Sequence, residues 1–166
     1  MATRLEPSRR LLREILREVY QGPAWHGPDL LATLRGIDAA AARRRPLRGR
    51  NSIWELVLHL AYSRYCLLHR LGVVTGHFAR PLRKSWWPRL PDELSPAQWG
   101  QDLKLLADYQ AQLLDAIARV PEVRLRGHRS GQTRTFAGEL LGVAIHDAYH
   151  AGQIRLMALS AHRGGS

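Results

Sequence analysis

The sequence predicts an all-α fold, a four-helix bundle with a long connection between its second and third long helices. Three observations lead to this prediction. Four long segments repeat apolar residues every three or four positions, which is the period of an amphipathic helix. Residues 73–96 contain four prolines and a tryptophan pair, a composition typical of a connection. No segment shows a convincing strand alternation, so the helices must cover one another to form the core.

Two helical regions are predicted before residue 50. Residues 8–20 carry one apolar stripe, and the stretch Gln21-Gly22-Pro23 ends this first long helix. Pro28 suits the start of a second, shorter region, which continues to Arg44. Pro46 then closes it, because proline interrupts a helix.

The second long helix is predicted over residues 52–71, with Asn51 or Ser52 as its cap. Glu55 stands three residues after Ser52, which is the spacing of a capping box. Gly72 follows the last apolar position and ends the helix.

The third long helix is predicted over residues 96–120, because Ser95 can cap it and Pro96 suits its first position. The alternating Val and Leu of residues 122–127 favour a short strand or turn. The fourth long helix is expected over residues 135–161.

Length and composition indicate one domain that spans residues 1–166, with a core large enough to be stable without disulfides or a structural metal. The single cysteine cannot form an internal disulfide, which agrees with a reducing compartment. The opening residues lack the apolar core of a signal peptide, and no run of about 20 apolar residues is present. We therefore expect a cytoplasmic protein that is neither exported nor embedded across a membrane.

The formal net charge is +11, an excess that attracts phosphate and other anions. Much of it comes from arginines on the predicted helices and their flanks, as on a solvated protein surface. No zinc-knuckle spacing, aromatic RNA-binding signature or recognition helix accompanies it. The sequence favours a solvated arginine surface over a nucleic-acid partner.

Three histidines form the most informative pattern. His146 and His150 are one helical turn apart and share a face of the last helix, so both can reach one ion. His59 lies in the apolar second long helix, where a polar ring needs a partner. Three imidazoles can hold a divalent ion and leave a coordination position open. From spacing alone, three separately hydrogen-bonded core histidines are an equally good interpretation.

Two further polar residues share a face with these histidines. Glu55 lies one turn before His59, and Gln153 lies three residues after His150, so each can contact a candidate ligand or a substrate. For Glu55 the capping box is a competing role, which we favour slightly.

At these residues the chain resembles the DinB-like superfamily of bacterial four-helix-bundle proteins, and its YfiT-like members in particular. Two motifs carry most of the resemblance, Asn51 to His59 and His146 to Ile154. The segment Ala24 to Gly27 and the stretch from Trp87 to Trp99 add to it, so that it covers nearly the whole chain.

The resemblance implies that His59, His146 and His150 are the ligands of a divalent metal, zinc or nickel, with a water in the open position. It further implies a homodimer and a small-molecule substrate. Characterised relatives include S-transferases and an isomerase that use a low-molecular-weight thiol such as bacillithiol or mycothiol. Where many relatives have histidine, this chain has Asn51, which affects only a cap or rim role.

Aromatic and polar residues near the three histidines are candidates for contact with a substrate. We expect Trp25, Trp86 and Trp87 to line the mouth of the site, and His26 or Gln153 to orient a substrate. No catalytic acid or base stands out beside the three histidines.

Three functions agree with the sequence. The first is a metal-dependent S-transferase in which the ion activates a thiol for attack on a small electrophile. The second is a metal-dependent hydrolase that uses metal-bound water, which an activity without added thiol would indicate. The third is a basic interaction module with a structural or vestigial metal, which steep salt dependence and indifference to loss of His59 would indicate.

Overall fold

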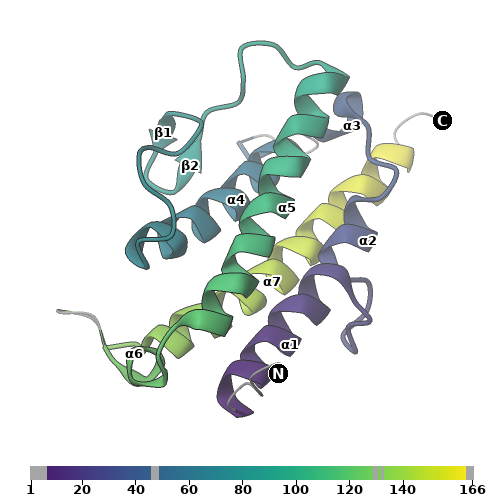
Figure 1. The fold of residues 1–166 in the computed structure, drawn as a ribbon. Helices are drawn as coiled ribbons and strands as arrows, with labels where there is room; N and C mark the ends of the chain where they lie inside the picture. The colour runs from purple at the N-terminus through teal and green to yellow at the C-terminus, as the bar shows by residue number, and fades with distance from the viewer. Residues whose placement is uncertain (1–6, 46–48, 129–130, 132, 164–166) are drawn as a thin grey trace.

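The computed structural model describes residues 7–45, 49–128, 131 and 133–163, and four long helices make up most of them (Figure 1). The predicted all-α fold is confirmed. The long helices are α1 (Pro7–Gln21), α4 (Ile53–Arg70), α5 (Pro96–Arg119) and α7 (Phe136–Arg163). Three short helices join them: α2 (Leu30–Leu34), α3 (Ala39–Arg43) and α6 (Glu122–Arg126). Pro46, the predicted end of the second helical region, lies outside the described residues.

The four long helices pack around a common core, as the predicted four-helix bundle requires. Helix α4 contacts α5 and α7, and α1 contacts the same two helices from the other side. Helices α4 and α5 run in one direction, whereas α1 and α7 run in the opposite direction (Figure 1). Since α4 and α5 are parallel neighbours, the chain between them must return along the full length of the bundle.

That return explains the long connection, and it contains a small sheet that the sequence did not reveal. Strand β1 (Leu82–Lys84) pairs antiparallel with β2 (Trp87–Pro88), with Leu82 opposite Pro88. The expectation of no sheet is therefore corrected for this hairpin. Its strands are very short, and β2 packs against α4, so tertiary contact rather than strand propensity determines the pairing.

The predicted strand or turn over residues 122–127 is instead helix α6, which ends at Arg126 with Gly127 as its cap. Pro121 precedes the helix with an extended backbone, and Leu125 is buried. A helical turn leaves Val123 exposed while Leu125 packs beneath α7 and its neighbours. An alternation of two apolar residues is too short to distinguish a strand from one turn of helix.

The capping box at the start of α4 is confirmed. The Ser52 hydroxyl accepts the Glu55 N–H at 3.2 Å, and the Glu55 carboxylate accepts the Ser52 N–H at 2.7 Å. Ser95 caps α5 in the predicted way, with Pro96 in its first turn. These caps satisfy backbone donors that the first helical turn leaves free.

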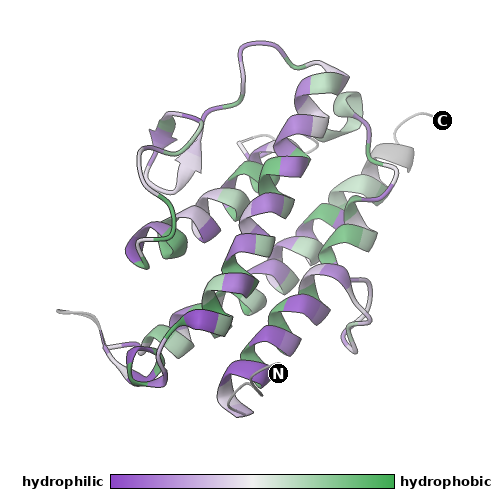
Figure 2. Cartoon of the chain, viewed as in Figure 1, coloured by the Kyte–Doolittle hydropathy of each residue, from purple (hydrophilic) through white to green (hydrophobic). Residues whose placement is uncertain are grey.

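Hydrophobic residues face the interior and hydrophilic residues face outward, most clearly on α1 (Figure 2). The core has two apolar clusters, one around Trp54 and Trp99 and the other around Leu113 and Leu140. None of the described helices combines the length and apolar composition needed to cross a bilayer.

Polar side chains meet in the interior between the two clusters. Arg64 of α4 forms an ion pair with Asp147 of α7, and both side chains are fully buried. The Arg64 Nε donates to Gln110 of α5 at 2.8 Å, and Gln110 donates to the Leu16 carbonyl of α1 at 3.1 Å. Four helices are thus tied at one level of the bundle.

Candidate metal centre

The three candidate ligands come from two neighbouring antiparallel helices. His59 stands in the middle of α4, and His146 and His150 stand one turn apart on α7. The side chains of His59 and His150 are buried, and that of His146 is half-buried. The structure thus brings together three residues that the sequence separates by up to 91 positions.

Their Nε2 atoms converge on one point. The Nε2 of His146 lies 2.9 Å from that of His59 and 2.9 Å from that of His150. All three ligand atoms lie within 4.8 Å of one another. A tetrahedral zinc ion with bonds of 2.0–2.1 Å to nitrogen holds its ligands about 3.3 Å apart, so small rotations of the rings complete such a site.

The other ring nitrogens of two ligands are held by hydrogen bonds. The Nδ1–H of His59 donates to the Trp86 carbonyl at 2.6 Å, and the Nδ1–H of His150 donates to the Gln153 side-chain oxygen at 2.7 Å. A neutral imidazole with its proton on Nδ1 presents a bare lone pair at Nε2. Partners of this kind orient metal-binding histidines and fix their tautomer.

The three neutral rings cannot all satisfy the hydrogen-bonding capacity of one another's Nε2 atoms. His59 and His150 each direct a bare Nε2 toward His146, and a neutral His146 carries at most one proton at that point. One of the two contacts is then lone pair against lone pair, which is repulsive. A cation at the centre removes this repulsion, so the donor set fits a divalent metal.

The electrostatic environment keeps the three rings neutral. Burial, followed by the neighbouring His150 and His59, lowers the pKa of His146 to about 3. Burial also lowers the pKa of His59 and that of His150, although the Trp86 carbonyl and Gln153 act in the opposite direction. Neutral imidazoles are the form that binds metal, so the site needs no deprotonation near pH 7.

A comparison with protein families agrees with this geometry. The family model of the DinB superfamily matches residues 24–154, a span that includes all three histidines. The chain belongs to the DinB superfamily. No curated protein and no solved structure matches the chain.

The connection of this DinB protein reaches the site through its hairpin. The Trp87 ring stacks on His59 with centroids 4.2 Å apart, and Trp86 lines the adjacent cleft. Trp86 has a φ of 67°, a left-handed conformation that is strained for a bulky residue. This backbone conformation aims the Trp86 carbonyl at His59, a contact for which the sequence carries no signal.

The remaining predicted residues divide into two groups. Gln153 contacts the site through His150, as described above. Glu55 points elsewhere, because its carboxylate caps α4 and accepts two hydrogen bonds from Arg45 at 2.7 and 3.1 Å. Burial alone would raise the pKa of Glu55, but the Ser52 backbone and Arg45 lower it below its usual value.

Trp25 and His26 lie on the surface of the DinB domain, in the segment between α1 and α2. The Trp25 side chain is 94% exposed. Among the described residues that line the cleft beside the histidines, neither of the two is present. The expected roles of Trp25 and His26 toward substrate therefore find no contact in this structure.

An open cleft of about 480 Å³ gives access to the centre. His59, His146 and Trp86 line it, and so do Ser63, Arg70, Arg134 and Glu139 among others. The sequence did not identify Ser63, Arg70, Arg134 or Glu139 as site residues, and it did not identify the buried pair Arg64–Asp147. Arg64 and Asp147 did carry a signal, since each is a charged residue in an otherwise apolar helical stretch.

Proposed function

We propose that this protein is a divalent-metal-dependent enzyme in which His59, His146 and His150 hold the ion. The observation that carries the proposal is the convergence of three Nε2 atoms beside an open cleft that His59 and His146 line. A structural ion is usually enclosed by four protein ligands, whereas three ligands beside a cleft leave a position for a reactant. Zinc and nickel both suit imidazole donors.

The reaction we favour is the transfer of a small thiol to an electrophile. A bound divalent ion would supply the acidity that converts a thiol to its thiolate near neutral pH. The sulfur then forms a bond to the electrophilic carbon, the leaving group departs with its bonding electrons, and the thiol proton passes to solvent. Reactants and products balance without an oxidant or reductant.

The chain's own residues would orient this reaction. The Trp86 carbonyl and Gln153 fix two ligand rings, and the neutral ligand set leaves the full charge of the ion available to the thiol. The Ser63 hydroxyl donates to the His59 carbonyl at 2.9 Å and also lines the cleft. Glu139 is a carboxylate on the cleft wall, but Arg70 holds both its oxygens.

The first test is elemental analysis of protein purified without a histidine tag or added metal. We expect nearly one zinc or nickel ion per chain, and its loss in His150→Ala. The control is His69→Ala, because His69 is an exposed histidine on α4 outside the centre. Wild-type protein that is metal-free and binds neither added zinc nor added nickel would refute the proposal.

A second experiment distinguishes transfer from hydrolysis. A chromogenic aryl halide is incubated with metal-loaded protein, with and without a small thiol. Transfer predicts that release of halide requires the thiol and consumes it in equal amount. Halide release without thiol would instead support metal-bound water as the nucleophile.

A further inference from the structure

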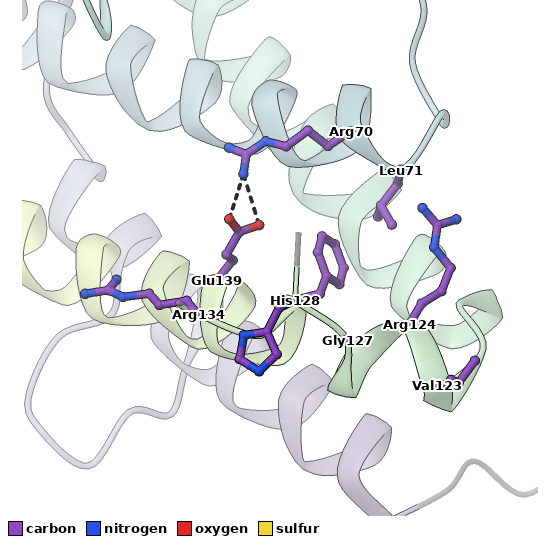
Figure 3. Close-up of a pocket in the computed structure, with 9 residues that line it drawn as sticks. Arg70, Leu71, Val123, Arg124, Gly127, His128, Arg134 and Glu139 are labelled. Carbon is purple, nitrogen blue, oxygen red and sulfur yellow. Dashed lines mark hydrogen bonds and ion pairs between the residues drawn. The ribbon is translucent and has the colours of Figure 1, made fainter. Parts of the chain in front are cut away.

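A second cavity of about 300 Å³ lies beside the metal cleft, between the end of α4, helix α6 and the start of α7 (Figure 3). Arg70, Arg134 and Glu139 line both spaces, so the cavity and the cleft adjoin. The metal centre therefore stands at one end of a longer depression, and this second cavity forms the other end.

Two of the three residues shared by the two spaces, Arg70 and Glu139, form an ion pair without net charge. The Arg70 Nη1 donates to both oxygens of Glu139, at 2.9 and 3.0 Å, and both side chains are largely buried. Figure 3 shows this pair bridging α4 and α7 across the cavity. Because each charge is compensated by the other, Arg70 and Glu139 fix the shape of the depression and do not determine the charge of a ligand.

The rest of the second cavity is cationic and apolar. Arg124 lies at one side of it, whereas Arg134, at the other side, directs its guanidinium away from the cavity and toward Gly142 of the metal cleft (Figure 3). Within the described part of the chain, neither is paired with a carboxylate. Leu71 and Phe136 supply apolar surface next to these charges. An anionic group attached to a short apolar body matches both features.

We propose that the second cavity binds the anionic end of an elongated small substrate whose other end reaches the histidine centre. The inference rests on the proposed function for the reacting end, and on the cavity alone for the anionic end. The shared chemistry is a carboxylate or phosphate group, with the exposed Arg124 side chain as its partner. Arginine binds both groups through paired hydrogen bonds.

The cavity is tested with the full-length protein as purified and 3-phenylpropionate as the probe. Binding is followed by NMR at the backbone amides of residues 123–128. We expect shifts with 3-phenylpropionate and none with the neutral 3-phenylpropanamide. A parallel titration with phenyl phosphate shows which anionic group is preferred.

Variants decide whether Arg124 is responsible. Arg124→Gln is expected to weaken binding of the carboxylate about threefold to tenfold, the range for a partly screened charged hydrogen bond. Arg155→Gln is the matched control, since Arg155 is exposed on α7 and lines neither space among the described residues. Equal binding of the neutral amide, or equal weakening by both variants, would overturn the proposal.

The link between the two ends is tested with cobalt-substituted protein, in which thiolate binding changes the visible absorption of the ion. We expect 6-mercaptohexanoate to bind more tightly than 6-mercaptohexanol, and Arg124→Gln to remove the difference. If neither thiol changes the spectrum while 3-phenylpropionate still binds, the anion site stands and the thiol function fails. If both thiols bind equally, thiol binding stands and the elongated substrate is refuted.

Discussion

Arg64→Met removes a guanidinium that joins α4, α5 and α7 in the interior of the bundle. Methionine retains an unbranched apolar chain but leaves the buried Asp147 without its cation. It also leaves the Gln110 oxygen without the Arg64 Nε donor. One Asp147 oxygen already has no hydrogen-bond partner among the described residues, so the carboxylate has no ready replacement.

The expected loss of unfolding free energy follows from these contacts. Burial already raises the pKa of Asp147, against the effect of Arg64, so without Arg64 the carboxyl becomes protonated in the folded state. Protonating a carboxyl of ordinary pKa, about 3.9, at pH 7 costs about 4 kcal/mol. This value is the upper limit of what the lost charge can contribute to the loss of unfolding free energy. The unpaired Gln110 oxygen adds about 1 kcal/mol. We expect a loss of about 3–5 kcal/mol, the range for a broken buried ion pair.

Urea unfolding of chelator-treated protein, followed by circular dichroism, measures this loss. The deficit should shrink to about 2 kcal/mol at pH 5, because the unfolded carboxyl is then closer to its own pKa. The double variant Arg64→Met/Asp147→Leu should recover most of the stability, since a buried pair replaced by apolar residues is often neutral. A single-variant loss below about 1 kcal/mol, or a double variant no more stable than the single one, would refute the reasoning.

Three other predictions concern pH, the hairpin and assembly. Metal-free protein should lose unfolding free energy as the pH falls from about 6.5 toward 3, by up to about 1.4 kcal/mol per pH unit from His146 alone. The reason is that the unfolded imidazole binds a proton that the buried ring does not. The urea unfolding midpoint should therefore change less with pH in His146→Phe than in wild type. Trp86→Gly should be about 1 kcal/mol more stable to urea than Trp86→Ala, because glycine accepts the positive φ; equal stabilities would exclude strain there. The expected homodimer would cover an exposed apolar stripe along α7. Light scattering should then give twice the chain mass for wild type and the single chain mass for Ile145→Lys. A monomeric wild type would contradict this prediction. The stripe comprises Leu141, Ile145, Tyr149, Leu156 and Leu159.

The long helices and their caps were predictable because their signals are local. Apolar residues at helical spacing and the Ser52–Glu55 box specify α4 without knowledge of its neighbours. The closeness of His146 and His150 also follows from helix geometry. His59 could be only a candidate from spacing alone, because its distance to α7 depends on how α4 packs.

The features that escaped prediction depend on contacts between distant segments. The hairpin places the Trp86 carbonyl on His59 through its packing against α4, and a backbone carbonyl has no residue signature. Helix α6 stands where a strand or turn was predicted, because the alternation is too short to interpret and a helical turn buries Leu125. Trp25 carries a family motif but is almost fully exposed, so residue type alone did not indicate its environment.

Because the Trp86 carbonyl accepts a hydrogen bond from His59, the connection as well as the helices positions the candidate metal centre. Two rigid helices determine where the three ligand nitrogens stand, whereas a surface connection determines which way one of them faces. Phe78, Trp87, Leu90 and Leu94 of this connection pack against the core, whereas residues 83–85 are exposed and can change with little loss of core contact. A change in residues 83–85 can thus alter the orientation of His59 in the candidate metal centre and leave the helical scaffold intact, which makes this turn the natural place to vary the proposed chemistry.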